Sequence, residues 1–584
     1  MKENRSPTWT MLMMVAPLLA CTGYDVEPES EFDERDGSSA TGGDDEQEKG
    51  GGGANSGNRG GSGAQSDPET DAGTASDASD RVDSAAVPVD ELPWPSSLSE
   101  LPSCAPWGDF EMPEIEPPQG DIFLNLSAPL QPVDVDERIE IEVRAAGTTA
   151  VDTAVSGAFS LDPGPEAIVV EQSELAGGRG EAVVRFQRPG LYTLHASIAG
   201  DERTGTAEVT AYRSQLPLWS MEIKEIDLDK LLVNTWQRVT VPALITIQGE
   251  TYETEVRIHG GSSRGYDKLS FRFDLGPDLV LPDTTDHIIL RGEWNDKTML
   301  RNYLSLELFR NATWVPASNA EIVHFRINQR YYGVLWHVER IGGDFLRLRG
   351  MNNETGAMYE ADPPLDCWNP GGGLVPLDSL ETYQCVYDQK KGEIEYDDLI
   401  ELIEKTLQLP DSQFAEVIDQ EVNVDEYLAY MAVMGVIQNQ DHVKKNYYLY
   451  RDPEARDKRW IVIPWDLELT FGHLWTEEND VLDEGIFANE PAIVGLCPGF
   501  CNQLTSRIYE IPKYQQRFYE FIDHIVENSF TEEFVDQRID NVICRATPDI
   551  LADPHKRAHD DEYLDRVDEI REFVVKRRAY LQGR

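Results

Sequence analysis

The feature that most limits how this chain can fold is an abrupt change in composition near residue 93. Residues 22–92 are dominated by Gly, Ser, Ala, Asp and Glu, and they contain almost no aromatic or branched apolar side chains. Such a segment cannot bury enough apolar surface to offset the chain entropy that is lost on folding. We therefore expect a disordered acidic linker over 22–92, extended by repulsion between its like charges, with folded domains only after it.

Residues 1–21 have the pattern of an export signal. Lys2 and Arg5 precede an apolar run that is shorter than the roughly 20 residues needed to cross a bilayer. The run ends in Leu-Leu-Ala-Cys, which resembles the lipobox of bacterial lipoproteins. The resemblance implies that Cys21 is acylated and anchors the chain to membrane lipid; a plain signal peptide with a chance cysteine is the alternative. Because Thr22 follows, where retention at an inner membrane usually needs Asp, we expect an outer-membrane or cell-surface location.

The charge of the chain excludes one class of partner. Asp and Glu number 106 against 51 Lys and Arg, which gives a formal net charge of -55. Such a charge repels the phosphates of nucleic acids. We therefore expect no nucleic acid partner.

Export of the chain changes the expected state of its remaining cysteines. An oxidising compartment favours disulfides, and six cysteines are left when Cys21 is set aside. We expect Cys367 to pair with Cys385. The pairing of the other four stays open: Cys497 and Cys501 could pair locally, or one of them could reach Cys544, and Cys104 has no assigned partner. A zinc site at CPGFC is the weaker alternative, because no second Cys or His pair lies at the required spacing.

With 584 residues the chain is too long for one core, so more than one folded domain is expected after the linker. Residues 93–212 contain short runs of alternating apolar and polar residues that are broken by Gly, Pro and Asp, which is typical of an antiparallel sandwich. The closing run GLYTLHASIAGDERTGTAEVTAY resembles the last hairpin of immunoglobulin-like bacterial surface modules. No catalytic constellation is visible in this module, and we expect a spacer or a partner-binding domain.

Residues 213–584 carry the candidate chemistry. Their first part is rich in strands and is interrupted by HGGSSRG, in which Gly260, Gly261, Ser262, Ser263 and Arg264 are candidates to fold over a phosphate; a polar hairpin turn is the alternative. The strand KLSFRF, which follows, places Lys268 and Arg272 on one face and apolar residues on the other.

A helix is expected after Asn295 and Asp296, which are plausible caps, because Leu300, Leu304 and Leu308 recur at helical spacing. Glu307 lies beside this apolar stripe. A buried glutamate there needs a cationic partner, which the basic strand could supply; a solvated glutamate is the alternative. Further runs with apolar residues at three- and four-residue intervals predict a helical part toward the C-terminus.

Seven segments in this region, in order and without large gaps, resemble the spore coat protein H (CotH) kinase-like family. They are VRIHGGSSR, KLSFRFDL, MLRNYLSLELF, YYGVLWHVERIGGDFL, QDHVKKNYYLY, WIVIPWDLELTFG and REFVVKRRAYLQ. The resemblance covers residues from about 216 to 584 and implies an α+β atypical protein-kinase-like fold, with a strand-rich N-lobe and a helical C-lobe. It also implies transfer of phosphate from ATP to protein serine with a divalent metal, although some members are surface proteins of unclear catalytic status.

The resemblance assigns roles to the segment that begins at QDHVKKN. The order Asp441, Asn446, Asp466 is like the catalytic loop and metal aspartate of ordinary protein kinases. Asp441 is the expected catalytic base, and Asn446 and Asp466 are expected to hold Mg²⁺ or Mn²⁺, which takes few protein carboxylates besides phosphate and water. The family usually has WDLD where this chain has WDLE, so Glu468 is a longer candidate ligand.

The nucleotide-binding set is completed by Lys268, Arg272, Glu307 and Trp460. Trp460 matches an aromatic position that in the family lies near the nucleotide base, and a buried core tryptophan is the alternative. Spacing does not decide between Lys268 and Arg272 as the phosphate ligand, and His442 is expected to be structural or to contact the substrate.

Two functions follow from these residues. The first is a lipid-anchored, exported protein serine/threonine kinase that uses ATP and acts on a protein substrate. The second is a catalytically inactive surface protein that binds or adheres, which the scarcity of ATP outside the cytoplasm favours. The acidic residues of the site repel one another unless a metal lies between them, which favours the kinase. A glycosidase is a weaker alternative, because nothing near Asp466 suggests a sugar cleft.

Overall fold

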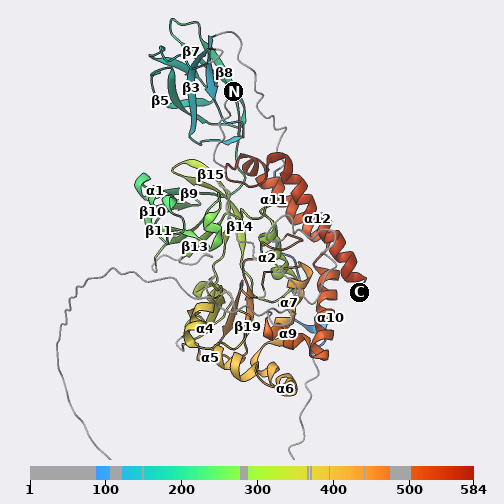
Figure 1. Cartoon of the computed structure of the whole chain (residues 1–584). Coiled ribbons are helices and arrows are strands. Elements are labelled where there is room, and N and C mark those ends of the chain that lie inside the picture. The colour runs from blue at the N-terminus through green and yellow to red at the C-terminus, as the bar shows by residue number, and fades with distance from the viewer. Residues whose placement is uncertain are drawn as a thin grey trace, which may run out of the picture. The chain divides into compact units, whose positions relative to one another are not determined.

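Three β-structures and a set of C-terminal helices make up the part of the chain that this computed structural model describes (Figure 1). The described residues are 87–105, 122–147, 150–276, 287–364, 367, 371–392, 395–439, 441, 442, 444–473 and 502–583. The expected export signal, the lipid site Cys21, most of the linker, and Cys497 and Cys501 lie outside them. No helix in this part of the chain combines the length and the apolar character that a bilayer span requires.

The first β-structure is a sandwich, as the alternating runs predicted. Its two four-stranded sheets have the orders β1-β3-β6-β5 and β2-β8-β7-β4, and their inner side chains share one apolar core. In β7, for example, buried and exposed side chains alternate strictly from Tyr192 to Ser197. The strands are β1 (Ile122–Ser127), β2 (Val133–Asp134), β3 (Ile139–Gly147), β4 (Phe159–Asp162), β5 (Ala167–Gln172), β6 (Arg179–Phe186), β7 (Gly190–Ile198) and β8 (Thr204–Tyr212).

The second β-structure is a closed barrel with the order β10-β11-β12-β13-β15-β14-β9. All neighbours are antiparallel except β14 and β9, which are parallel and close the barrel. Its interior is filled by inward residues such as Phe271, Phe273 and Phe325, none of which is exposed. The strands are β9 (Leu218–Glu222), β10 (Val241–Ile247), β11 (Glu250–His259), β12 (Ser270–Asp274), β13 (His287–Arg291), β14 (Ala320–Ile327) and β15 (Arg330–Val338).

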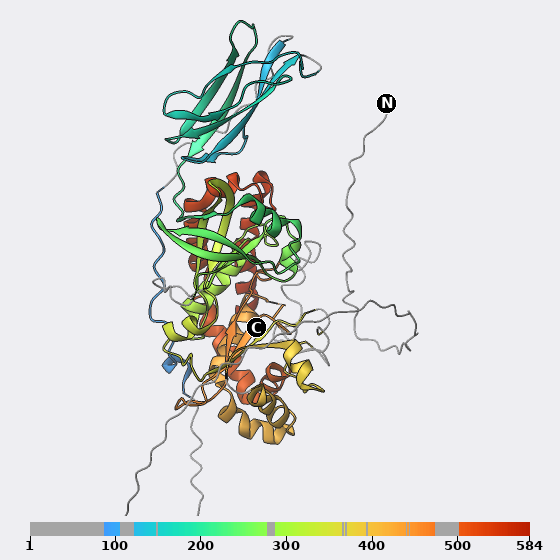
Figure 2. The same ribbon diagram turned by 90° about the vertical axis from the view of Figure 1, so that its left-hand side faces the viewer.

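A third sheet, of order β17-β16-β18-β19, forms the base on which the C-terminal helices pack. Figure 2 shows the yellow to orange helices around this sheet, whereas the dark red helices lie beside the barrel in both views. The strands are β16 (Ala357–Ala361), β17 (Tyr387–Lys391), β18 (Tyr447–Arg451) and β19 (Ile461–Pro464).

The longer helices are α2 (Arg301–Ala312), α6 (Asp411–Glu421), α7 (Val424–Val436), α10 (Pro512–Asn528), α11 (Glu532–Ala552) and α12 (Asp560–Gln582). The shorter helices are α1 (Glu225–Val233), α3 (Gly343–Leu348), α4 (Leu380–Val386), α5 (Asp397–Ile400) and α9 (Gln503–Tyr509).

The predicted helix after Asp296 is α2. The Asp296 carboxylate accepts hydrogen bonds from the backbone N–H groups of Leu300 and Arg301, at 3.0 and 2.9 Å, and so caps the first turn. Nearly every residue of α2 is buried, including Glu307, so the helix is internal and its glutamate is not solvated. The cations that pair with Glu307 are Arg310 and Arg538 of the helices, and the predicted partner, the basic strand, is not among them.

Residues 87–105, which we call the N-terminal strap, do not belong to the sandwich to which residues 93–105 were assigned. Trp94 stacks on His524 of α10 with ring centroids 4.0 Å apart, and it meets Trp314 edge-on at 5.0 Å. The Ser99 hydroxyl donates to Glu307 of α2 at 3.0 Å. Large aromatic contacts of this kind dominate packing energies, so the strap is part of the helical core rather than the start of the sandwich.

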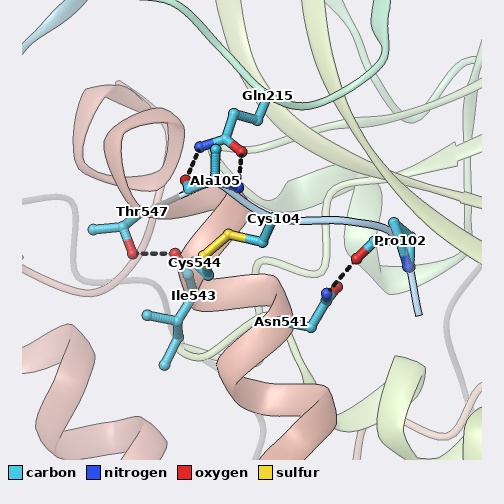
Figure 3. The surroundings of a disulfide bond; sticks show 8 residues. All are labelled: Pro102, Cys104, Ala105, Gln215, Asn541, Ile543, Cys544 and Thr547. Carbon is cyan, nitrogen blue, oxygen red and sulfur yellow. Dashed lines mark hydrogen bonds between the residues drawn. A yellow bond between two sulfur atoms is a disulfide. The ribbon is translucent and has the colours of Figure 1, made fainter. Parts of the chain in front are cut away.

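A disulfide fixes the end of the strap (Figure 3). Cys104 is bonded to Cys544 of α11, across 440 residues of sequence. Beside it, Asn541 donates to the carbonyl oxygen of Pro102 at 2.7 Å, and Gln215 exchanges two hydrogen bonds with the backbone of Ala105. The expected Cys367–Cys385 disulfide is confirmed. The suggestion that Cys544 pairs with Cys497 or Cys501 was wrong, because the strap brings Cys104 back onto α11.

Candidate functional site

The candidate site lies where β18 begins and β19 ends. These strands are antiparallel, with Tyr447 opposite Pro464, so the residues just outside them, Asn446 and Asp466, come together. The Asn446 side-chain amide donates to the backbone oxygen of Asp466 at 3.5 Å. Both residues have left-handed backbone angles, φ 66° for Asn446 and φ 55° for Asp466. Asn and Asp tolerate this region better than most residues, and such angles concentrate at functional sites.

Asp441 completes the predicted trio. Its carboxylate accepts from the Asn446 side chain at 2.8 Å and from the Lys445 ammonium at 2.9 Å. Burial raises the pKa of Asp441 to about 6, against the attraction of Lys445 and with some repulsion from Asp466. The structure therefore brings Asp441, Asn446 and Asp466 to one place, as the sequence predicted. The neighbouring His442 is buried, with Nδ1 2.9 Å from the carbonyl oxygen of Asn439, which favours a structural role.

Arg291, at the end of β13, joins the barrel to this site. Its guanidinium lies 2.5 Å from Asp466, 2.7 Å from Glu293 and 3.5 Å from Glu468. Burial opposes the charge of Asp466, but the attraction of Arg291 and Lys445 outweighs it and lowers the pKa of Asp466. Burial, Asp466 and Glu293 raise the pKa of Glu468 well above its usual range. Three acids thus share one arginine.

Two further arginines lie on the outer face of the barrel, on the strands that precede β13 in the barrel order. Because Phe271 and Phe273 fill the barrel, Arg272 between them points outward, and the strand register places it opposite Arg257 of β11. Burial and the nearby Arg272 lower the pKa of Arg257 to about 10. Arg272 itself pairs with Asp274 at 2.8 Å. We call Arg257, Arg272 and Arg291 the arginine row.

Residues 260–265, which we call the glycine turn, follow β11 directly and lie near Asp466 and Glu468. Gly260 has φ +104°, and a Cβ at this position would lie 2.0 Å from the Ser263 hydroxyl, so glycine is required there. Gly261 faces open space. Tyr266, after the turn, stacks on Trp294 at 4.8 Å, and burial together with the charge of Glu468 raises its pKa. The turn with Ser262 and Ser263 is thus near Glu468, but Arg264 is turned away and donates to the carbonyl oxygen of Trp236 at 3.3 Å.

Three predicted nucleotide-binding residues are not brought to this site. Lys268 and its partner Asp553 are both fully buried, with the ammonium 2.7 Å from the carboxylate. Glu307 pairs with Arg538 at 2.9 Å beneath the strap. Trp460 is 1% exposed within the main core, which favours the core alternative over contact with a base. The period-two pattern placed Lys268 and Arg272 on one face correctly, but it could not reveal that Asp553 neutralises Lys268.

Sequence reasoning missed Arg291, Lys445 and Arg257. Arg291 is the last residue of a short strand and falls in none of the seven matching segments. Lys445 and Arg257 lie within the quoted segments QDHVKKN and VRIHGGSSR, so their charge next to the candidate acids was an available signal.

The side chains at the site offer oxygen atoms, which are the ligands that a magnesium ion prefers. Asp466, Asn446 and Glu468 offer oxygen ligands, and one buried carboxylate oxygen of Glu293, Oε2, has no hydrogen-bond partner in the part of the chain that the structure describes. Among the described residues, no three His, Cys, Asp or Glu side chains converge closely enough to hold a metal without help.

Comparison with known proteins gives one family match and one relative. Residues 256–581 match the family model described as CotH kinase protein. The chain is also 27% identical to the inner spore coat protein H of Bacillus subtilis (strain 168) over 379 residues, which cover 63% of this chain and 98% of that protein. The family match spans more than half of the chain and includes the arginine row and the residues from Asp441 to Glu468. The chain therefore belongs to the CotH kinase protein family.

Proposed function

We propose that the protein is an exported protein serine/threonine kinase that transfers the γ-phosphate of ATP to a hydroxyl group of a protein. The observation that carries the proposal is the meeting of Asp441, Asn446 and Asp466, with Lys445 and Arg291 as their counter-ions. Phosphoryl transfer needs little more than positioning and neutralisation of charge, and an acid, an amide, a second acid and arginines supply both.

Asp441 acts as the base that orients the substrate hydroxyl and accepts its proton. A base works best when its pKa lies near the operating pH, and burial brings the pKa of Asp441 to about 6. Lys445 and Asn446 hold the carboxylate in one orientation, since both bind the same oxygen, Oδ2. The other oxygen is then the one that faces the incoming hydroxyl.

Asp466 and Asn446, with Glu468 as a further oxygen donor, would hold Mg²⁺ or Mn²⁺. The metal, when bound, neutralises charge on the triphosphate. The arginine row would bind the phosphate oxygens that the metal leaves free, because a guanidinium fork matches two such oxygens. The open backbone at Gly261, next to Ser262 and Ser263, allows close approach of a phosphate.

The location that we propose is the outer membrane or the cell surface, with the acyl chain on Cys21 as the lipid anchor. The relative from Bacillus subtilis is named as a spore coat protein, which supports a surface role. ATP is scarce outside the cytoplasm, so we further propose that the transfer occurs before export or from a trapped nucleotide. The acceptor is a protein of the same surface.

The experiment that tests this function measures Mg²⁺-dependent binding of ATP and phosphate transfer to a mixture of surface proteins. Asp466→Ala should abolish metal-dependent binding of ATP. Asp441→Asn should keep that binding and lower transfer by about 10²- to 10⁴-fold, because it removes only the base. Transfer by Asp441→Asn at the unmodified rate would refute the role of Asp441, and absence of ATP binding to the unmodified protein would refute the kinase.

A second candidate function is a surface-binding protein without catalysis. Two observations favour it: Arg291 already neutralises Asp466 at 2.5 Å, and Trp460 has no exposed face for a base. In that case the acids and Arg291 would form a structural ion cluster, and the protein would bind its partner equally well with and without Mg²⁺-ATP.

A further inference from the structure

Asn302, in the first turn of α2, is a buried polar residue to which the proposed chemistry gives no role. Its side-chain amide donates to Oε1 of Glu293 at 2.9 Å. Its side-chain oxygen accepts from the backbone N–H of Leu467 at 3.1 Å. Glu293 lies two residues beyond the end of β13, and Leu467 follows Asp466 directly. Asn302 therefore ties the end of a barrel strand to residues 466–470, which we call the Asp466 loop.

The contacts of Asn302 close a ring. Arg291 binds the same oxygen of Glu293 through its Nε at 2.7 Å, and it binds Asp466 through a second nitrogen at 2.5 Å. The peptide bond from Asp466 to Leu467 then leads back to the amide that Asn302 binds. The ring runs through Asn302, Glu293, Arg291, Asp466 and Leu467. Because each member is held from two sides, none can move without disturbing two contacts.

The position between Glu293 and Leu467 requires a particular kind of side chain. An ionised carboxylate can only accept a hydrogen bond, and a backbone N–H can only donate one. The residue between them must therefore donate on one side and accept on the other. A short amide does both, whereas an ionised aspartate lacks the donor and a lysine lacks the acceptor. An asparagine is thus the residue that fits here.

Two members of the ring have an unfavourable backbone conformation. Glu293 has φ 47° and Asp466 has φ 55°, both in the left-handed region. Glutamate in particular seldom adopts it. Such conformations persist only where the surrounding contacts impose them. Asn302 binds the side chain of Glu293 and the amide that follows Asp466, so it supplies one such contact to each.

A second residue of α2 supports the far end of the Asp466 loop. Ser305 lies three residues after Asn302 and so on the same face of the helix. Its hydroxyl is 3.1 Å from the hydroxyl of Thr470, which in turn donates to the carbonyl oxygen of Leu467 at 2.9 Å. Ser305 and Thr470 are both fully buried. The loop is therefore held at both ends by one polar face of an internal helix.

We propose that Asn302 is a positioning residue of the candidate site. It holds the Asp466 loop in register with the barrel, so that Asp466 and Glu468 keep a fixed place relative to Arg291. Asn302 itself contacts neither metal nor phosphate. Its effect on nucleotide binding rests on the proposed kinase function, whereas its hold on the loop does not.

The hold on the loop is tested by hydrogen–deuterium exchange of the whole protein without nucleotide. In Asn302→Ala the amide of Leu467 loses its acceptor, so it should exchange about 10-fold faster. Asn311→Ala is the matched control. Asn311 lies in the same helix, is equally buried at 4% exposed, and donates to the carbonyl oxygen of Glu307 at 2.7 Å. This control should leave the exchange of Leu467 unchanged.

The consequence for the site is tested with Mn²⁺-ATP, by calorimetry and by transfer kinetics. Asn302→Ala should bind Mn²⁺-ATP about 10- to 100-fold more weakly and show a correspondingly higher KM. The dependence of kcat on pH should stay unchanged, because Asp441 is not a member of the ring. Asn311→Ala should bind Mn²⁺-ATP as the unmodified protein does.

A second variant keeps the shape of the side chain, in case Asn302→Ala does not fold. Asn302→Asp retains the acceptor for Leu467 but lacks the donor for Glu293 when it is ionised. At pH 8 the amide of Leu467 should therefore exchange as slowly as in the unmodified protein, while Mn²⁺-ATP binds about 10-fold more weakly. Unchanged binding in Asn302→Asp would overturn the role of the ring.

The remaining outcomes separate this inference from the kinase proposal. Absence of Mn²⁺-ATP binding to the unmodified protein would refute the kinase, and the exchange of Leu467 would still decide whether Asn302 holds the loop. Equal effects of Asn302→Ala and Asn311→Ala on that exchange would overturn the hold. Faster exchange in Asn302→Ala with unchanged binding of Mn²⁺-ATP would overturn the positioning role.

Discussion

Two cation–carboxylate pairs join the barrel to the rest of the domain, and they differ in one respect that matters. Lys268 and Asp553 are both fully buried, and the pair is closed off from any ligand. Arg291 and Asp466 are held as closely, but 29% of the Asp466 side chain remains exposed and two further acids share the same arginine. The first pair is complete without a ligand, whereas the second has acid groups in excess of its cation.

The comparison teaches that a basic residue on the correct strand face is not enough to identify a phosphate ligand. Lys268 and Arg272 come from the same strand region and have the same parity. What separates them is the partner that the fold supplies: a buried aspartate at the end of α11 for Lys268, and a half-exposed aspartate on the same strand for Arg272. The following four variants test that difference, in order of expected effect.

The largest effect is expected for Lys268→Met. Removal of the ammonium leaves the Asp553 carboxylate buried without its cation, which typically costs about 3–5 kcal/mol. Urea unfolding should therefore show a loss of that size. Lys405→Met, which breaks an exposed pair with Glu401, should cost less than about 1 kcal/mol. Equal losses for the two variants would show that the Lys268 pair is not the closed structural contact described here.

Glu426→Gln tests a buried acid whose Oε1 has no hydrogen-bond partner among the described residues. The pKa of Glu426 is raised from 4.5 to about 8, so the carboxyl group destabilises the fold progressively as pH rises through this interval. Glutamine carries no such penalty. The free energy of unfolding of the variant should exceed that of the unmodified protein by about 2–4 kcal/mol at pH 9, and by almost nothing at pH 4. A gain that is independent of pH would contradict this explanation.

Arg291→Met tests the open pair. A hydrogen bond to a charged group contributes about 1.5–3 kcal/mol, so the affinity for Mg²⁺-ATP should fall by about 10- to 100-fold. The affinity for Mg²⁺ alone should rise, because the three acids lose their competing cation. Calorimetric titration with each ligand separates the two effects. If neither affinity changes, Arg291 belongs to the structural class with Lys268.

The smallest effect concerns the pH dependence of transfer. Asp441 must be ionised to act as a base, so the rate should rise with pH and level off above its pKa of about 6. We call this rise the acidic limb of the pH–rate profile. Lys445→Met removes the cation nearest to Asp441, so the pKa of Asp441 should rise and the acidic limb should lie about 1 pH unit higher. Lys458→Met, at an exposed lysine of the same hairpin, should leave the limb in place. A limb that does not move would show that Asp441 is not the titrating group.

Much of the fold was predictable because it follows from local pattern. The alternation in β7, the helical spacing in α7 and α12, and the short separation of Cys367 and Cys385 can all be read from neighbouring residues. The trio of Asp441, Asn446 and Asp466 was predictable for the same reason, since a single hairpin brings it together.

The remainder depends on contacts between residues that are distant in sequence. The burial of Trp460, the pairing of Lys268 with Asp553 and the return of the strap to α11 each require the tertiary structure. Glu426 is a further example. Its position in the first turn of a helix is ordinary for a glutamate, and only the tertiary structure shows that one of its oxygens is buried without a hydrogen-bond partner among the described residues.

The bond between Cys104 and Cys544 also determines how the molecule responds to mechanical pulling. Tension applied at the N-terminal side of the strap passes through the sulfur bridge directly into α11, and the sandwich, which lies between the two cysteines in sequence, bears none of it. A pulled molecule would thus keep its sandwich folded until that bridge is reduced, and a thiol reagent would switch the load onto the strands from β1 to β8.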